Sequence, residues 1–406
     1  MSLVPIRWVS QQECASREED TAGTPPDASA DVTHDVTSDV TFDVTSDVTF
    51  DVTQPAVKLA LLDQRLLPGE TREVLLEDAR GVATAITDMV VRGAPAIGIA
   101  AAYGVALEAF VINREGGDWQ SRLASACDVL AASRPTAVNL FWALDRMRKV
   151  IAAHVTRSQA PYEALLKEAV RIHEQDLDDN LRMAEFGAQV IAASLAQGET
   201  RCEVMTHCNT GALATGGHGT ALGVIRTAYA QGIVGRVHVN ETRPWWQGSR
   251  LTAWELVQEK IPARLAVEGA ASLIMQQGAR TPEGVRWLIV GADRIAANGD
   301  TANKIGTFSL AVQARAHGIK VMVVAPLATF DGTLATGADI PIETRDAAEL
   351  REAGGRQIAP QDIDVFNPVF DVTPHEYIDA IVTEHGVVES PDSDSVGALL
   401  GRAMRR

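Results

Sequence analysis

The amino-acid sequence predicts an α/β protein with two parts. The first is a mostly helical N-terminal domain with a small antiparallel sheet, and the second is a Rossmann-like C-terminal domain built on a parallel sheet. From Thr71 to about Ser194, apolar residues recur mostly at helical spacing. After Gly198, short apolar runs alternate with helical stretches, which is typical of right-handed β-α-β units. A chain of 406 residues is long enough for both domains.

Two short strands are predicted near the start of the chain, at residues 4–9 and 57–62, where they would form a hairpin. The segment 11–54 between them holds Asp-Val-Thr six times within residues 31–53, and this period of four suits neither a helix nor a strand. We therefore predict a disordered low-complexity insertion, which is tolerable because loop-closure entropy grows slowly with length. The alternatives are an extra hairpin of the repeated Val and Thr residues, or a tail that binds a partner or is phosphorylated.

The remaining domain boundaries follow from the change in the spacing of apolar residues after the helical region. Residues 1–10 supply the first strand of the N-terminal domain, which continues over 55–195; the C-terminal domain covers 196–390 and ends in a short tail, 391–406. Helices are predicted at 73–91, 96–110, 136–153 and 162–195 in the first domain, and at 218–231, 249–259, 268–277 and 307–317 in the second. Strands of the second domain are predicted at 202–207, 235–240, 286–291, 319–325 and 338–342.

The composition excludes several classes of protein. No apolar run approaches the roughly 18–20 residues that span a bilayer, so we expect no membrane anchor. Residues 1–14 lack the basic start and apolar core of a signal peptide, so we expect a cytoplasmic protein. A net charge of −17 without a basic stripe argues against nucleic-acid binding. The cysteines (Cys14, Cys127, Cys202 and Cys208) show no CxxC spacing, which argues against a disulfide framework or a zinc site.

Two reactive residues follow apolar runs that we predict to be strands. Cys208 comes after the run 202–207, and Asp293 comes after the run 286–291. Because the carboxyl ends of parallel strands bind ligands, we expect a thiol and a carboxylate on one rim, where they could act as a proton-transfer pair. An apolar environment would raise the pKa of Asp293 and let it act as a general acid, unless Arg294 pairs with it. The alternatives are a buried structural cysteine and a solvated strand-end aspartate.

Two further segments have the pattern of a phosphate site at the start of a helix. Arg92-Gly93-Ala94-Pro95 and Ser133-Arg134-Pro135 each place an arginine and a proline at a predicted helix start. Free N–H groups at such a start attract anions, and the forked donors of arginine suit a phosphate. A plain helix-helix turn with a surface arginine is the alternative for each segment, but the occurrence of two in one domain favours a phosphate site.

Polar residues after two other strands could complete a sugar-phosphate site. Gln247 could hydrogen-bond sugar hydroxyls beside an apolar wall formed by Trp245 and Trp246, although a Pro-Trp loop packed on the core would look the same. Asn303 and Lys304 together could bind a phosphate or a hydroxyl group.

The sequence does not indicate a metal or a nicotinamide cofactor. His207, His218 and His238 match no ligand spacing, so we interpret them as core or capping residues. A dinucleotide fingerprint that contained Gly217 and Gly219 would need a third glycine at position 222, which is a leucine. This argues against an oxidoreductase that uses NAD.

Taken together, these segments resemble the methylthioribose-1-phosphate isomerase family of the methionine salvage pathway. The resemblance covers nearly the whole chain, from Leu61-Leu62-Asp63-Gln64 to Phe366-Asn367-Pro368-Val369-Phe370-Asp371-Val372-Thr373-Pro374. That family shares a superfamily with regulatory subunits of a eukaryotic initiation-factor exchange complex and with ribose-1,5-bisphosphate isomerase. The insertion 11–54 is the main departure from the family pattern, and it leaves the site motifs untouched.

The resemblance implies an aldose-ketose isomerase that converts 5-methylthio-D-ribose 1-phosphate into 5-methylthio-D-ribulose 1-phosphate. It implies a homodimer that needs neither metal nor cofactor. It also implies that Asp293 and Cys208 are the catalytic pair. The residues that would hold the sugar phosphate are Arg92, Gly93, Ala94, Arg134, Gln247, Asn303 and Lys304.

Other functions remain as alternatives to this reaction. A non-catalytic sensor of sugar phosphates or nucleotides would not need both Cys208 and Asp293. An isomerase of ribose 1,5-bisphosphate would need a second phosphate site, where we expect the apolar Trp245 and Trp246. A side activity on 5-deoxyribose 1-phosphate is chemically close to the implied reaction. The sequence also leaves open whether hydrogen moves between C2 and C1 as a proton or as a hydride.

Overall fold

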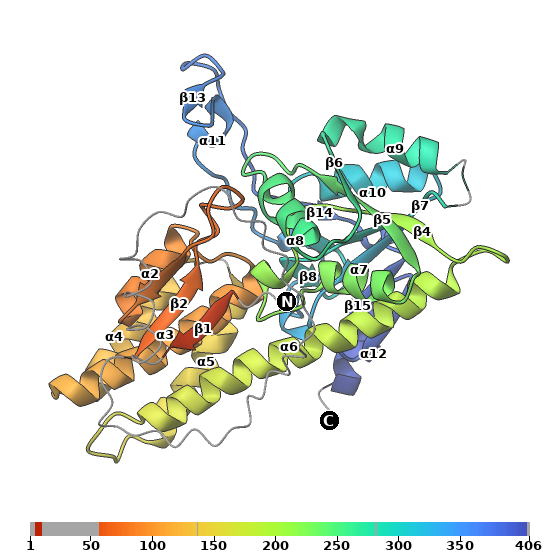
Figure 1. The fold of residues 1–406 in the computed structure, drawn as a ribbon. Coiled ribbons are helices and arrows are strands. Elements are labelled where there is room, and N and C mark those ends of the chain that lie inside the picture. The colour runs from red at the N-terminus through yellow and green to blue at the C-terminus, as the bar shows by residue number, and fades with distance from the viewer. Residues whose placement is uncertain (1–4, 10–56, 136, 280, 282, 404–406) are drawn as a thin grey trace, which may run out of the picture.

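The computed structural model describes residues 5–9, 57–135, 137–279, 281 and 283–403, and Figure 1 shows how these parts are arranged. The predicted insertion at 11–54 lies outside the described residues. A helical part and a part built on a large sheet lie side by side, and the long helix α6 runs from one part to the other (Figure 1).

A small antiparallel sheet opens the helical part. It consists of β1 (Ile6–Val9), β2 (Lys58–Leu62) and β3 (Glu73–Leu76), with β2 in the middle. The antiparallel pairing of β1 with β2 confirms the predicted hairpin strands.

The helix predicted at 73–91 is wrong in its first turn. Residues Glu73–Leu76 pair with β2, and helix α2 occupies only Ala79–Thr87. The side chain of Asp78 accepts a hydrogen bond from the N–H of Gly81, which marks the start of the helix. Pairing with a strand that is distant in sequence outweighed the local helical spacing.

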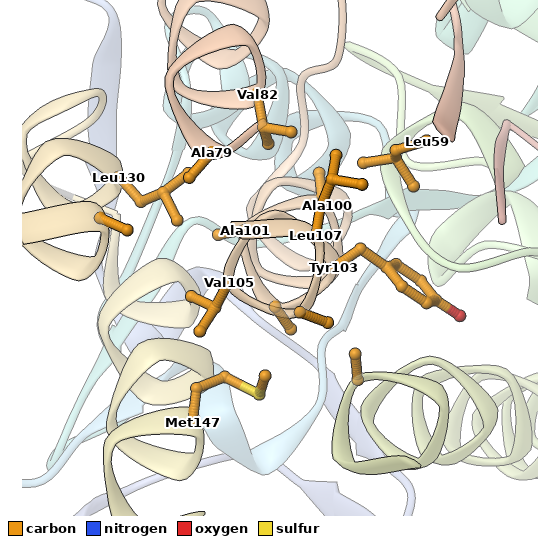
Figure 2. Packing of buried hydrophobic residues seen from close by; sticks show 14 of the residues in the cluster. Leu59, Ala79, Val82, Ala100, Ala101, Tyr103, Val105, Leu107, Leu130 and Met147 are labelled. Carbon is orange, nitrogen blue, oxygen red and sulfur yellow. The ribbon is translucent and has the colours of Figure 1, made fainter. Parts of the chain in front are cut away.

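Helix α3 (Ala94–Glu115) forms the centre of the helical part. It is long and apolar enough to cross a membrane, but 83% of its most apolar stretch is buried inside the protein. Figure 2 shows the side chains of Leu59, Val82, Leu130 and Met147 packed around it. The helices that surround it are α2, α4 (Trp119–Ala132), α5 (Val138–Ala153) and the first half of α6 (Tyr162–Ala193). The high apolar content of α3 is therefore explained by its place in the core.

The second part is built on a sheet whose strand order among the described residues is β16-β15-β10-β7-β4-β5-β6. Its strands run parallel, except that β16 is antiparallel to β15. They are β4 (Cys202–Thr206), β5 (Val234–Asn240), β6 (Ala263–Ala266), β7 (Val285–Val290), β10 (Lys320–Val324), β15 (Ala380–Thr383) and β16 (Gly386–Glu389). The predicted fold class, helical with a small antiparallel sheet and then a mainly parallel sheet, is confirmed.

Helices cover both faces of this sheet. Successive residues of a strand point to opposite faces, so alternate residues of β7 pack against different helices. Trp287 and Ile289 pack with the second half of α6 and with α7 (Ala221–Ala230). Leu288 and Val290 pack with α9 (Ala271–Gly278) and α10 (Thr307–Ala316) on the other side. Strands β4 and β7 are parallel neighbours, so the loops that follow them both start at the same edge of the sheet.

A second, smaller sheet lies beside that edge. Its order is β11-β8-β9-β14, from β8 (Arg294–Ala296), β9 (Thr301–Lys304), β11 (Phe330–Asp331) and β14 (Phe370–Thr373). The sequence did not predict these strands, which are short. Two of them, β11 and β14, pair with strands that are distant in the chain. An arm with α11 (Ala348–Arg351), β12 (Glu352–Ala353) and β13 (Arg356–Gln357) projects from this region (Figure 1).

Other elements differ from their predictions. The strand predicted at 338–342 is wrong, since Gly337–Asp339 form a 3₁₀ helix (η5). The helix predicted at 249–259 divides into the π-helix η2 (Gly248–Thr252) and α8 (Ala253–Gln258). The segment 391–406, predicted as a tail, contains helix α12 (Ser393–Ala403), with Val396 and Leu399 buried. The remaining short 3₁₀ helices are η1 (Ala212–Ala214), η3 (Glu268–Ala270), η4 (Leu327–Thr329) and η6 (His375–Tyr377).

Candidate active site

A pocket lies between the two parts of the molecule, at the carboxyl ends of β4, β7 and β10. This is the edge at which parallel α/β sheets bind ligands. All the site residues predicted from the sequence line it, from both parts of the chain. They are Arg92, Gly93, Ala94, Arg134, Cys208, Gln247, Asp293, Asn303 and Lys304.

Cys208 follows β4 and is 7% exposed within the pocket. The preceding residue, His207, is fully buried, and its Nε2 atom lies 2.8 Å from the carbonyl oxygen of Ile305. Cys208 has a φ angle of 63°, in the left-handed region that residues other than glycine seldom adopt. The turn after β4 therefore holds the thiol in an unusual but defined backbone conformation.

Asp293 lies in the loop between β7 and β8, and its N–H donates to the carbonyl oxygen of Ala302 at 2.9 Å. Part of its surface faces the pocket, but the surrounding protein removes enough water that burial raises the pKa of its carboxyl group. Nearby positive charges, of which Lys304 is the strongest, act in the opposite direction. Arg294 instead donates to Asp331 at 3.2 Å. The carboxyl group of Asp293 is thus held close to cations while burial favours its protonated form.

The turn before α3 brings Arg92 to the loop that carries Cys208. Arg92 donates from Nη1 to Oδ1 of Asn209 at 2.7 Å and from Nη2 to the backbone oxygen of Asn209 at 2.8 Å. Gly93 has a φ of 99°, and a Cβ atom there would lie 2.5 Å from the backbone of Ala214. Only glycine allows this close approach, which places the amino end of α3 at the pocket.

Two more arginines bring positive charge to the pocket. Arg134 comes from the connection between α4 and α5, and burial lowers the pKa of its guanidinium group. Arg345 comes from the segment before the projecting arm, where it lies 3.3 Å from Glu343 and 3.5 Å from Glu349. Sequence reasoning missed Arg345 because no motif marks the irregular segment that carries it.

Asn303 and Lys304 enter the pocket from β9. The side chain of Asn303 donates to Oγ1 of Thr307 at 3.0 Å. Burial lowers the pKa of Lys304 to about 8, although negative charge at Cys208 and Asp293 raises it. Gln247 is buried in the pocket wall, and its Oε1 atom has no hydrogen-bond partner within the described part of the chain. An amide oxygen without a partner can accept a hydrogen bond from a ligand hydroxyl.

The tryptophans do not form the predicted apolar wall, since neither is among the described residues that line the pocket. Trp245 packs against a small leucine cluster, and the guanidinium of Arg250 lies 4.0 Å from its ring. Trp246 lies under Arg243 at 4.4 Å. The apolar lining comes from other residues: Met89, Ile97, Val324, Ile340, Pro341, Val369 and Phe370.

The histidines that could have suggested a metal have hydrogen-bonding partners of their own. His218 lies 3.3 Å from Oγ1 of Thr227, and His238 lies 2.7 Å from Oε2 of Glu203. Over the residues that the structure describes, no cluster of three or more metal-ligating side chains occurs. The site offers several basic side chains, a carboxyl group with a raised pKa and a thiol. This set suits acid-base chemistry on a phosphorylated small molecule.

Comparisons with known proteins agree with this chemistry. The model of the initiation factor 2 subunit family matches residues 90–390. A methylthioribose-1-phosphate isomerase of Pseudomonas aeruginosa (strain UCBPP-PA14) is 56% identical over 344 residues, which cover 85% of this chain and 93% of that protein.

Two solved structures are also similar to this chain. The crystal structure of 5-methylthioribose 1-phosphate isomerase from Pyrococcus horikoshii OT3 is 42% identical, has a TM-score of 0.77, and covers 85% of this chain and 94% of its own. The structure of the translation initiation factor eIF-2B subunit delta from A. fulgidus is 40% identical, has a TM-score of 0.72, and covers 84% of this chain and 97% of its own.

Proposed function

Since the chain belongs to the initiation factor 2 subunit family and, within it, to the methylthioribose-1-phosphate isomerases, we propose that its pocket converts 5-methylthioribose 1-phosphate into 5-methylthioribulose 1-phosphate. The protein is an aldose-ketose isomerase of methionine salvage. The observation that carries the assignment is the position of Cys208 and Asp293 after adjacent strands, in a pocket that basic residues surround.

Asp293 is the acid that opens the sugar ring in this mechanism. The phosphate on C1 removes the free hemiacetal, so the ring cannot open spontaneously and its oxygen must be protonated. Burial raises the pKa of Asp293, which favours the protonated acid that this step requires. The bond between C1 and the ring oxygen then breaks, and the ring oxygen leaves as a hydroxyl group.

Cys208 handles the hydrogen that moves from C2 to C1. As a thiolate it would remove the C2 proton, and the electron pair of the C–H bond would form the C1–C2 double bond of an enol phosphate. A proton would then return at C1 while the C2 hydroxyl becomes the ketone. In the competing route, hydrogen shifts directly as a hydride and Cys208 stabilises the transition state. Loss of deuterium from C2 to solvent during turnover would support the proton route, and complete retention would count against it.

The basic residues hold the phosphate while apolar residues exclude water. Arg92 and Arg134 supply forked donors that suit phosphate oxygens, and Lys304 adds a third charge. Asn303 and Gln247 supply polar groups for sugar hydroxyls or phosphate oxygens. The apolar side chains that line the pocket suit the methylthio group and limit the access of water to the intermediate.

The experiment that tests this function is turnover of the purified protein on 5-methylthioribose 1-phosphate, with EDTA and no added cofactor. Cys208→Ser and Asp293→Asn are assayed beside the wild type. We expect the wild type to form the ketose and each variant to form it at least about 100-fold more slowly. A folded wild type that forms no product would favour a sensor or a different sugar phosphate.

We propose in addition a cytoplasmic homodimer, as the resemblance to the family implies. Strand β6 is an edge of the large sheet, and the apolar side chains of Val257, Leu265 and Val267 are at least half exposed on or beside it, which gives a second copy a surface to cover. Sedimentation equilibrium of the purified protein tests the dimer, and a monomer at micromolar concentration would contradict it.

A further inference from the structure

The backbone of Cys208 is held by two threonines that lie behind the pocket. Its left-handed conformation is unusual for a residue with a side chain, and Thr242, the first of the two threonines, is also left-handed with a φ of 65°. A β-branched residue in this region is a genuine outlier. Backbone outliers of this kind persist where the surrounding structure holds them, and they gather at functional sites.

Thr242 contacts the amino side of Cys208. Its Oγ1 atom accepts a hydrogen bond from the N–H of Cys208 at 2.9 Å and donates to the carbonyl oxygen of Asn240 at 3.0 Å. Thr242 is fully buried and follows β5, the neighbour of β4 in the sheet. The hydroxyl group thus ties the turn after one strand to the turn after the next.

Thr252 contacts the carbonyl side of Cys208. Its Oγ1 atom donates to the carbonyl oxygen of Cys208 at 2.6 Å and accepts from Nδ2 of Asn209 at 3.2 Å. Thr252 is 1% exposed and ends the π-helix that precedes α8. Both backbone polar groups of Cys208 are therefore bound by threonine hydroxyls, and neither threonine is among the residues that line the pocket.

The same contacts connect Cys208 to the phosphate-binding side of the pocket. Asn209, which donates to Thr252 and to Oε1 of Glu255, accepts two hydrogen bonds from Arg92. The thiol and one of the cations are thus positioned by a single buried network. A change in the backbone of residue 208 would move the thiol relative to a substrate that Arg92 holds.

We propose that Thr242 and Thr252 are positioning residues that aim the Cys208 thiol at the sugar. The inference rests on the proposed function, in which Cys208 acts on the hydrogen at C2. A hydroxyl that accepts the N–H and a hydroxyl that donates to the C=O together hold the left-handed turn. Loss of either hydroxyl leaves a buried backbone group of Cys208 without that partner, and the turn can relax by rotation that moves the thiol.

The test uses Thr242→Val and Thr252→Val, which remove the hydroxyl groups but keep the branched shape. Thr383→Val is the matched control, because Thr383 is also fully buried and its hydroxyl also joins two backbone groups, the N–H of His385 and the carbonyl oxygen of Gly386. We expect kcat to fall roughly 10- to 100-fold in each of the two variants, with KM within about threefold of wild type. The control is expected to change kcat by less than about threefold.

Serine at either position restores a hydroxyl, so Thr242→Ser and Thr252→Ser should recover most of the lost kcat. A second readout is the rate at which iodoacetamide alkylates Cys208, measured on the Cys208 peptide by mass spectrometry from pH 6 to 10. We expect the pH profile of alkylation to differ from wild type in the valine variants and to be unchanged in Thr383→Val.

The outcomes separate this inference from the proposed function. Valine variants that match the wild type in kcat and in the alkylation profile would overturn the positioning role, as would an equal loss of kcat in Thr383→Val. If the wild type shows no turnover, the proposed function fails. The alkylation profiles then still decide whether the two threonines control the thiol.

Discussion

The helical part and the sheet part contribute different kinds of residue to the same pocket. From the helical part come Arg92 and Arg134, each just before a helix, and both bring positive charge. From the sheet part come Cys208 and Asp293, each just after a parallel strand, and both can exchange protons. The comparison suggests a division of labour, in which the helical part mainly binds the phosphate and the sheet part mainly carries the chemistry.

Helix α6 connects the two parts and also reaches the loop that follows Cys208. His173 Nε2 lies 2.7 Å from the carbonyl oxygen of Gly216, and the carboxylate of Asp176 accepts from the N–H of Gly216 at 2.7 Å. Both backbone groups of Gly216 are thus bound by one helix. The two parts are therefore coupled in structure, even though their proposed roles differ.

The strongest test of this division is Asp293→Asn in the sheet part. Asparagine cannot donate the proton that opens the ring, so we expect kcat to fall by roughly 10²–10⁴-fold. Binding of the substrate should stay within about tenfold, because the acid acts mainly in the transition state. Steady-state kinetics and calorimetric titration measure the two effects.

Asp331→Asn is the matched control for Asp293→Asn. Asp331 is a nearby carboxylate that accepts from Arg294 and is not among the pocket-lining residues. An Asp293→Asn variant with a kcat close to that of the wild type would show that Asp293 does not act in the mechanism. A variant that loses only substrate binding would assign Asp293 to binding and would contradict the proposed division of roles between the two parts.

The converse test is Arg92→Ala in the helical part. Loss of the guanidinium removes a forked phosphate donor, so we expect KM to rise by roughly 10- to 100-fold. A smaller fall in kcat should accompany it, since Arg92 also donates twice to Asn209, next to Cys208.

Arg146→Ala serves as a control for Arg92→Ala, because Arg146 is a partly buried arginine of the same part that pairs with Glu168 and is not among the residues that line the pocket. Arg92→Lys keeps the charge but loses the fork, and its KM should lie between those of wild type and Arg92→Ala. A KM unchanged in Arg92→Ala would place the phosphate elsewhere.

Lys304 is one of the cations that the sheet part contributes to the pocket, and its titration gives a smaller effect. Its pKa of about 8 means that the pocket loses one positive charge as the pH rises through that value. We therefore expect kcat/KM to fall above about pH 8, by less than tenfold per pH unit.

Rate profiles of the wild type and of Lys304→Arg between pH 6 and 10 measure this. The arginine stays charged, so the part of the fall that persists in the variant belongs to another group. A profile of the wild type that is flat from pH 7 to 9.5 would contradict the role of Lys304.

The smallest effect concerns the connection between the parts. Burial raises the pKa of Asp176 from 3.8 to about 7, so protonation favours the folded state. Its contribution to stability is present below about pH 4 and is lost as the pH rises through about 7. Asp176→Asn keeps an acceptor for Gly216 but cannot titrate. We expect the fall in Tm between pH 5 and 8 to be smaller in this variant by roughly 2–5 °C.

Differential scanning calorimetry at the two pH values measures the change in Tm. Asp178→Asn, at an exposed position of the same helix, is the control and should follow the wild type. If Asp176→Asn shows the same fall in Tm as the wild type, Asp176 does not account for the pH dependence.

Much of the site could be predicted from the sequence because its residues occupy local positions that leave a pattern. An apolar run followed by a polar residue marks Cys208 and Asp293, and an arginine with a proline at a helix start marks Arg92 and Arg134. Arg345 has no such mark, since it lies in an irregular segment and reaches the pocket only through the folding of the chain. The roles of all these residues stay predictions until the variants are assayed.

The sequence by itself determined the class of the fold, because hydrophobic periodicity decides which segments become helices and which become buried strands. The tertiary structure alone decided that Glu73–Leu76 pairs as a strand, that β9 pairs with β14, and that Trp245 turns away from the pocket. It also decided that the hydroxyl groups of Thr242 and Thr252 meet the backbone of Cys208. These contacts join residues more than ten positions apart in the chain. The energy of these contacts depends on which surfaces the fold brings together, and the local spacing of apolar residues in the sequence does not indicate this.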